Sequence, residues 1–373
     1  MFSSLLGIRL ILWMGATIPR PTPPEMLKAL SSVEVRNDSQ SQSGDGFELK
    51  FTLAKDNMGE YNLLGSGSLD PFNRVIIGVL LGVTPEVLID GIITRHQLSP
   101  SNDPGESTLT VSGADISVML DLEEKSEGHA NQPDFLIAYK ILGSYGRYGI
   151  VPLVTPTTDV PIMIQRVPRQ WETDYRFLQR MARRNGFVFY IEPLTFGVNK
   201  AHFGPENRLS IPQPALSVGL GEFTNVRTLS FSNDAMAPVD SEGSFVEPIT
   251  KTSLPMPSLP SLRVPPLARN PVNARRRTVQ REMSNRNPAS AAVASVASST
   301  NSPEPVEGRG ELDSVRYGHV LRARKLVGVR GSGLSYDGFY YVKSVIHTIQ
   351  KGEYTQNFTL SREGTGAILP VVR

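Results

Sequence analysis

The chain has 373 residues, of which 39% are hydrophobic and 20% are charged, and its formal net charge is +2. This length allows roughly two or three domains with cores of their own, and the near-neutral charge gives no support for a nucleic acid or an acidic membrane surface as the partner. The chain has no cysteine, so disulfides and thiolate metal sites are excluded, which suits a reducing compartment.

The apolar stretch Leu5–Ile18 allows two interpretations, a signal peptide or a buried strand. Arg9 interrupts it, no basic residue precedes it, and it is too short to span a bilayer. We therefore predict a buried strand over Gly7–Met14 and no direct membrane insertion. A proline-rich corner follows, and Pro24 is suited to the first turn of a short helix that ends at Leu30.

Short alternating runs separated by Gly, Pro and Asp turns come next. The predicted strands are Val33–Val35, Phe47–Leu53, Arg74–Leu81, Val87–Arg95 and Ser107–Ser112. We expect the last of these to pair with Ile89–His96. Strands this short and frequent indicate a barrel or a sandwich instead of a parallel α/β sheet. The predicted fold class is therefore β-rich α+β, with two barrel-like domains and a few clamping helices.

Three helices are predicted after these strands. The first is Ala114–Leu122, with Asp115 near its positive end. The second is Pro133–Gly143, and its predicted buried side consists of Phe135, Ile137, Ala138, Ile141 and Leu142. The third covers residues 173–185. Strands at 187–192, 199–204 and 223–231 would then continue a second β unit.

The third helix has the most regular pattern in the chain. Thr173 is suited to be its N-cap, and Asn185-Gly186 ends it because glycine reaches the left-handed conformation without a Cβ penalty. One apolar stripe is formed by Phe177, Leu178, Met181 and Ala182, whereas four arginines lie largely off it, at 176, 180, 183 and 184. The pattern predicts a helix that packs on a core, with no catalytic role.

The composition changes at about Asn233. Residues 234–310 are rich in proline and contain a basic run, Arg275–Arg281, and a small-residue tract, Ala289–Thr300. Proline denies both helix and ladder hydrogen bonds and small residues bury little area, so we predict an extended insertion, with one possible helical stretch at Val272–Ser284. Three strands are predicted beyond it: Tyr317–Val329, Phe339–Gln350 and Gln356–Arg362, the last pairing back onto the second.

No catalytic constellation is apparent in the sequence. The five histidines have no partner at helical ligand spacing, so no metal is expected, and no cofactor motif is present. The acidic cluster Glu123, Glu124 and Glu127 is interpreted as a solvated face. The glycines of residues 328–333 lack the Gly-Lys-Ser/Thr ending of a phosphate loop, which favours a strand turn. The basic runs are not interleaved with aromatics, which favours a subunit interface over nucleic acid.

Three blocks of sequence, taken in order, resemble one protein family. The block TDYRFLQRMARRNGFVFYIE at 173–192 resembles the helix–strand signature of the phage late-control D family and of the hub region of VgrG spike proteins. Residues Val87–Leu120 are similar to its paired strands, and Tyr336–Glu363 to its closing hairpin. The resemblance covers most of the chain outside roughly 235–310.

The resemblance implies a structural hub protein of a contractile phage tail or a phage-like injection system, with no enzymatic activity. A homotrimer of two-barrel subunits would join the hexameric inner tube to the trimeric spike. Other expected partners are further baseplate proteins and a separate spike protein, because no spike region precedes the end at Arg373. The protein would assemble in the cytoplasm into the baseplate of the particle.

The resulting division has four parts: a first barrel-like domain over 1–113, helical clamps and a second β-rich domain over 114–232, the insertion over 233–312, and strands rejoining the hub over 313–373. We expect the insertion to wrap a neighbouring hub subunit or an adjoining baseplate protein. Its interface residues would be Arg275, Arg276 and Arg277.

Two alternatives for the function stay open. A cell-wall hydrolase lacks a plausible acid/base pair, and a glycan-binding module would need clustered aromatics, whereas Trp13 and Trp171 are far apart in sequence.

Overall fold

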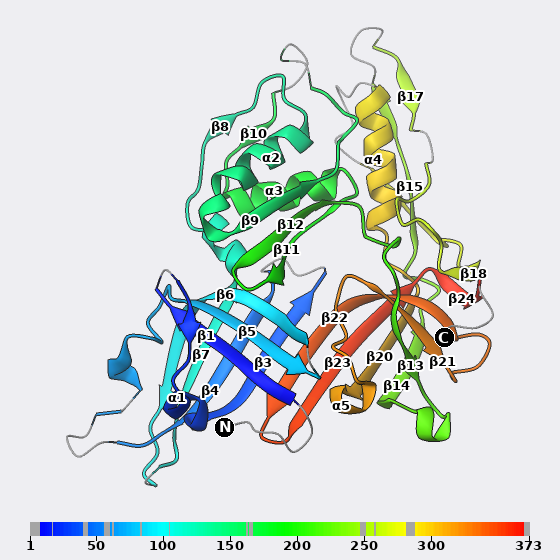
Figure 1. Cartoon of the computed structure of the whole chain (residues 1–373). Helices are drawn as coiled ribbons and strands as arrows, with labels where there is room; N and C mark the ends of the chain where they lie inside the picture. Colours follow the sequence, from blue (N-terminus) through cyan, green and yellow to red (C-terminus); the bar gives the residue numbers. More distant parts are fainter. Residues whose placement is uncertain are drawn as a thin grey trace.

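The computed structural model contains two curved β units side by side, a helical lobe above the first of them, and a column formed by the insertion next to that lobe (Figure 1). The structure describes residues 8–16, 18–39, 44–55, 60–61, 63–82, 84–103, 105–161, 163, 167–246, 251–256, 259–280 and 288–368. Among these residues no helix is both long and apolar enough to cross a bilayer.

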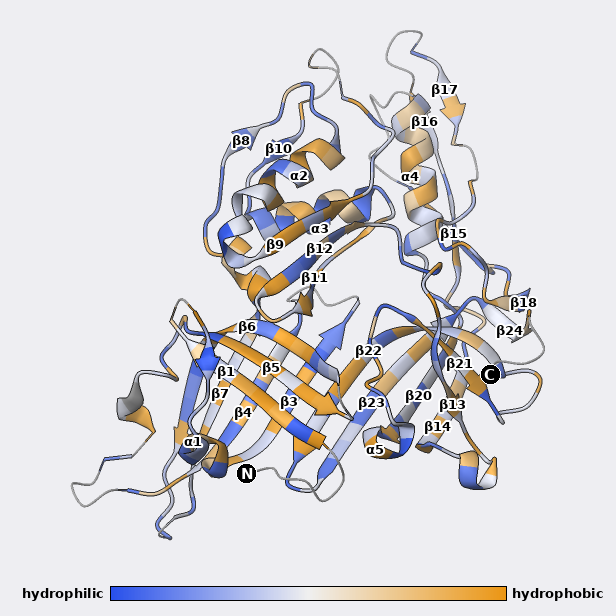
Figure 2. Ribbon diagram, viewed as in Figure 1, coloured by the Kyte–Doolittle hydropathy of each residue, from blue (hydrophilic) through white to orange (hydrophobic). Residues whose placement is uncertain are grey.

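The first β unit holds the N-terminal strands. Its elements are β1 (Ile8–Gly15), β2 (Arg20–Pro21), α1 (Pro24–Ala29), β3 (Leu30–Asp38), β4 (Gly46–Leu53), η1 (Leu64–Ser66), β5 (Arg74–Leu81), β6 (Thr84–Ser99) and β7 (Ser107–Asp115). The predicted strands Val33–Val35 and Phe47–Leu53 are present within β3 and β4, which pair with each other: Val33 lies opposite Leu49 and Val35 opposite Phe47. These side chains alternate into one core, and β3 and β4 are banded accordingly in Figure 2.

Two further predictions for this unit are confirmed. β7 pairs with β6 as expected, with His96 opposite Val111, and with β4 on its other side. The N-terminal strand exists and buries Leu12 and Met14, while Gly7, where it was predicted to begin, lies outside the described residues.

The second β unit is built from segments on both sides of the insertion. Its elements are β13 (Gln213–Ser217), η4 (Gly221–Phe223), β14 (Val226–Asn233), β20 (Val306–Asp313), α5 (Ser314–Tyr317), β21 (Leu326–Arg330), β22 (Gly338–Gln350) and β23 (Glu353–Arg362). It includes β20, so the insertion ends before Val306 and not at 312 as predicted. The two units share one sheet of 13 strands, because β22 pairs with β21 over its first residues and with β3 from Ser344 onward. The hairpin of β22 and β23 is as predicted.

Two strand predictions were wrong in this region. Residues 223–231 do not continue the strands at 187–204; β14 pairs with β20 in the second β unit instead. The predicted strand Tyr317–Val329 begins only at Leu326, because Asp313 accepts hydrogen bonds from the backbone N–H groups of Val315 and Arg316 and starts the short helix α5.

The helical lobe lies between β7 and the second unit in sequence. Its elements are η2 (Ile116–Leu120), β8 (Glu127–Gly128), α2 (Asp134–Ser144), η3 (Gly146–Tyr148), β9 (Ile150–Val154), β10 (Arg169–Gln170), α3 (Asp174–Arg184), β11 (Val188–Thr195) and β12 (Val198–Gly204). The predicted helix Ala114–Leu122 is shorter than expected and of the 3₁₀ type, since β7 runs on to Asp115, which caps η2 at the N–H of Ser117. Helix α2 buries its predicted side except for Phe135, which is half-buried.

Helix α3 agrees with the sequence pattern. The hydroxyl of Thr173 accepts from the N–H of Arg176, and Gly186 has a φ of +69° directly after the helix. All four stripe residues, Phe177, Leu178, Met181 and Ala182, are buried in the core that α2, α3 and the sheet β11–β12–β9 share. The stripe therefore packs as predicted.

The insertion is folded, which corrects two predictions. Its elements are β15 (Val239–Glu242), β16 (Ser244–Val246), β17 (Ser253–Pro255), β18 (Ala268–Pro271), β19 (Arg276–Val279) and α4 (Pro288–Asn301), and β18 pairs with β24 (Gly364–Ala367). The small-residue tract is a helix, because small side chains let α4 approach the backbone at Gly186, where an added Cβ would lie 3.0 Å from the Cα of Ala297. The proposed helical stretch Val272–Ser284 is instead the strand β19 over Arg276–Val279, which pairs with β15; residues 281–284 lie outside the described residues.

Candidate functional site

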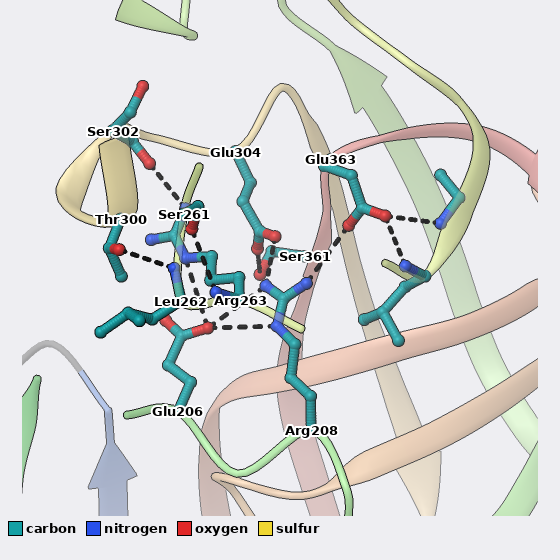
Figure 3. A network of polar contacts seen from close by, with 12 residues as sticks. Glu206, Arg208, Ser261, Leu262, Arg263, Thr300, Ser302, Glu304, Ser361 and Glu363 are labelled. Atoms are coloured by element: carbon teal, nitrogen blue, oxygen red, sulfur yellow. Dashed lines mark hydrogen bonds and ion pairs between the residues drawn. The ribbon is translucent and has the colours of Figure 1, made fainter. Parts of the chain in front are cut away.

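The most prominent polar constellation is a buried clasp around Arg208 (Figure 3). The guanidinium is fully buried and contacts three carboxylates, at 2.5 Å for Glu304 and at 3.2 Å for both Glu206 and Glu363. Burial alone would raise the pKa of Glu304, but the charges of Arg208 and Arg263 outweigh it and hold that pKa below its ordinary value. Glu304 is therefore ionised, and its charge is paired with that of Arg208.

The clasp joins four segments that are far apart in sequence. Arg208 follows the last strand of the helical lobe, Arg263 belongs to the insertion, Glu304 follows α4, and Glu363 follows β23. Arg263 donates to the carbonyl of Ser302 at 2.7 Å and lies 3.3 Å from Glu206. Glu363 in turn accepts from the N–H of Ala268 at 2.7 Å. The middle of the insertion, at Arg263 and Ala268, and its C-terminal end, at Glu304, are thus held to the lobe and to the second β unit.

A second buried arginine connects both β units with the helical lobe. Arg324 lies just before β21 and donates to the carboxylate of Asp45 at 2.6 and 2.8 Å. Its guanidinium also stacks over the ring of Tyr190 on β11, 4.4 Å from the centroid. Burial and the charge of Asp45 raise the pKa of nearby Asp115 to about 8. This shift favours the neutral form of Asp115 beside the ion pair of Arg324 and Asp45.

A third arginine fixes the helical lobe to the first β unit. Arg74 on β5 makes a bidentate pair with Asp90 on β6 at 2.6 and 2.7 Å and donates to the carbonyl of Tyr148 at 3.0 Å. Asn199 on β12 donates to the same carboxylate at 2.9 Å. Arg208, Arg324 and the nearly buried Arg74 therefore fix the relative positions of the parts of this fold.

The sequence did not single out Arg74, Arg208 or Arg324. Each has at least one carboxylate partner between 16 and 279 residues away, and these distant partners leave no mark in the local spacing. The nearest available signal was chemical: an arginine in an otherwise apolar, strand-forming context needs a buried carboxylate partner.

The residues that the sequence did single out lie elsewhere. Arg275, Arg276 and Arg277 are exposed on and next to β19, and Arg277 pairs with Glu242 at 2.9 Å. Glu123, Glu124 and Glu127 are exposed, as interpreted.

The glycines at 331 and 333 both have a φ of +88° in the turn after β21, which agrees with a strand turn. Burial lowers the pKa of His347 to about 3, so this histidine is neutral. In the part of the chain that the structure describes, no cluster of His, Asp and Glu fits a metal ion.

Comparison with known proteins places this fold among tail proteins. No protein-family model matches the sequence, and no curated protein matches it. Among solved structures, the chain is similar to the 43 kDa tail protein of prophage MuSo2 from Shewanella oneidensis, with a TM-score of 0.64 at 15% identity over 95% of this chain and 98% of that one. The tail protein from Neisseria meningitidis MC58 gives a TM-score of 0.59 at 14% identity, over 96% and 98% of the two chains.

A third solved structure extends the likeness to secretion systems. The E. coli c3393 protein, a component of the type VI secretion system with structural similarity to the T4 tail proteins gp27 and gp5, gives a TM-score of 0.53 at 12% identity, over 92% of this chain and 77% of that one. The resemblance noted in the sequence is thus confirmed at the level of the fold. The chain has the β-rich fold of phage tail and VgrG-related proteins.

Proposed function

We propose that the protein is a structural hub of a contractile tail or a phage-like injection system, where a homotrimer of it joins the hexameric inner tube to the trimeric spike. The observation that carries this proposal is the pair of β units in one chain. They share one sheet through β22 yet have separate apolar cores. Two such units per subunit allow three chains to present six similar contacts, which matches threefold to sixfold symmetry.

The buried arginines support the same role. An adaptor between two rings must transmit force without changing shape, so its parts need fixed relative positions. Arg208 and Arg324 supply this by pairing with carboxylates of other parts of the chain, and Arg74, paired with Asp90 in its own unit, donates to the backbone of the lobe. Removal of one partner would leave a buried charge. The role needs no catalytic group, and the similar solved structures are tail and secretion components. We infer a non-enzymatic protein whose partners are the inner tube protein, the spike protein and further baseplate proteins.

The test is the mass of the assembled state. Native mass spectrometry of the purified chain, and of the particle baseplate if one is isolated, should give three copies. A monomer or a hexamer in the baseplate would overturn the trimer. Electron microscopy of cells that express the surrounding genes should show a sheathed particle with this chain at its tip. Release of soluble fragments from peptidoglycan by the purified chain would favour the hydrolase instead.

The role of the insertion in this proposal differs from the one that the sequence suggested. The sequence suggested that it wraps a neighbour because it could not build a core. The structure shows α4 packed on α3 and on β15 of the same chain. Wrapping a neighbouring subunit stays a prediction, and limited proteolysis tests it: protection of residues 240–300 only in the assembled particle would support it, and equal protection in the free subunit would contradict it.

A further inference from the structure

The outer edge of the insertion is a positively charged, open strand, which we call the basic ribbon: β15, β19 and the preceding Arg275. β15 packs against α4, and β19 pairs with β15 only, so among the described residues the second edge of β19 is unpaired. Every residue from Arg275 to Val279 is exposed, and Val279 is 74% exposed. Such an edge, with an apolar residue at its end, is available to a partner.

The ribbon has more positive charge than it can neutralise. β15 contributes Asp240 and Glu242, and Glu242 pairs with Arg277. For Arg275 and Arg276 the described part of the chain shows no carboxylate within ion-pair distance. The ribbon therefore presents unpaired guanidinium groups along the edge that is farthest from α4.

On the opposite side of the helical lobe lies a segment of opposite charge, the acidic arm, residues 121–128 with β8. Glu123, Glu124 and Glu127 are exposed there, and none of them has an ion pair among the described residues. The only cation of the arm, Lys125, is already occupied, because its ammonium lies 2.6 Å from Asp174. The arm thus faces solvent with carboxylates alone.

The arm and the ribbon cannot meet within one chain. Figure 1 shows β8 at one side of the lobe and β15 at the other, with α2, α3 and α4 between them. Complementary patches on opposite sides of a subunit suit head-to-tail contacts, which close into a ring when the rotation between neighbours allows it.

We propose that the basic ribbon of one subunit binds the acidic arm of the next copy of this chain, so that this contact closes the ring. The inference rests on the proposed trimer and adds the residues that form its contact. Arg275 and Arg276 would pair with Glu123, Glu124 and Glu127 of the neighbour.

The experiment uses charge reversal in the full chain. One variant carries Arg275→Glu, Arg276→Glu and Arg277→Glu, a second carries Glu123→Arg, Glu124→Arg and Glu127→Arg, and a third carries all six changes. A control variant carries Arg95→Glu and Arg316→Glu, two exposed positions on the β units. Native mass spectrometry and sedimentation measure the trimer, and circular dichroism checks that each variant is folded.

Each triple reversal should raise the dissociation constant of the trimer roughly tenfold or more, and the sixfold variant should restore it, because the charges are complementary again. Salt should weaken the wild-type trimer more than the triple variants, since exposed charges are screened. An equimolar mixture of the two triple variants should not restore a closed trimer. In a ring with an odd number of subunits, two copies of the same variant must become neighbours, and in each triple variant the ribbon and the arm have charges of the same sign.

Several results would overturn the contact. If the trimer forms but neither triple reversal weakens it, the contact is wrong while the hub trimer stands. If the control weakens it equally, net charge and not the contact is responsible. If the ribbon variant loses affinity for a double-stranded DNA fragment while the trimer persists, the ribbon binds nucleic acid. A wild-type chain that does not trimerise, alone or in the particle, would overturn both the contact and the proposed function.

Discussion

The β units and the insertion are stabilised in different ways. Each β unit encloses a large cluster of buried Leu, Ile, Val, Phe and Tyr side chains. The buried residues of α4 are Ala291, Ala294, Ser295, Ala297 and Thr300, which bury little apolar area. The insertion replaces that missing area with polar contacts: the hydroxyls of Ser295 and Thr300 accept from the N–H groups of Leu259 and Leu262, at 3.1 and 2.9 Å. A segment with only small apolar clusters can thus fold when side chains satisfy its extended backbone.

This difference predicts which substitutions reduce the free energy of unfolding most. Apolar cores lose stability in proportion to the volume that is removed, whereas a buried ionic clasp fails when one member is lost, because the remaining charges have no partner.

The largest effect is expected at the clasp. Arg208→Ala leaves the nearly buried carboxylates of Glu206 and Glu304 without their common partner and should reduce the free energy of unfolding by about 3–5 kcal/mol. Chemical denaturation measures the loss, and proteolysis should cut residues 240–300 first. Arg309→Ala is the matched control, since Arg309 is 75% exposed in its pair with Glu307 and should cost under about 1 kcal/mol. Similar losses for both variants would contradict the distinction between buried and exposed pairs.

A substitution in an apolar core should reduce the free energy of unfolding by a comparable amount, but it should not release the insertion. Leu178→Ala in α3 removes fully buried methyl groups and should cost about 2–5 kcal/mol in the free energy of unfolding. Arg183→Ala on the exposed side of the same helix should cost under about 1 kcal/mol. Denaturation of the isolated subunit compares the two, and equal destabilisation would show that the orientation of α3 is wrong.

The contact between α3 and α4 can be tested with two glycines. Gly186 and Gly105 both have left-handed backbone angles, φ +69° and +81°, so Ala should cost about 1–2 kcal/mol at each from backbone strain alone. At Gly186 the new Cβ would also meet Ala297 and Thr300 of α4, whereas at Gly105 it meets nothing within 4 Å. We expect Gly186→Ala to cost about 2–4 kcal/mol in total and to speed amide hydrogen exchange in α4. If both variants lose the same stability, α4 does not depend on this contact.

The smallest effect is expected at a single hydroxyl. Ser295→Ala removes the acceptor for the N–H of Leu259 and should cost about 1 kcal/mol, with faster hydrogen exchange at that amide. Ser230→Ala on the exposed strand β14 should stay within about 0.5 kcal/mol. Unchanged exchange at Leu259 would mean that the hydroxyls of α4 do not hold the extended segments.

The sequence by itself determined the features that depend on neighbouring residues. The cap at Thr173, the apolar stripe of α3 and the helix end at Asn185-Gly186 follow from spacing within a few turns, and all three are present. The turn after β21 and the β22–β23 hairpin were recognisable for the same reason. The exposure of Arg275, Arg276 and Arg277 followed from their charge.

Only the tertiary structure decided the features whose partners are distant in the chain. β14 joins β20 because the chain returns to the sheet at Val306, within the range predicted to be insertion, which no local pattern records. Helix α4 was missed because small residues bury little area alone, and its stability comes from Gly186 and the backbone of residues 259–262. The arginine clamps were missed because a buried charge is stable only where the fold brings a carboxylate to it, and for Arg324 that carboxylate is 279 residues away.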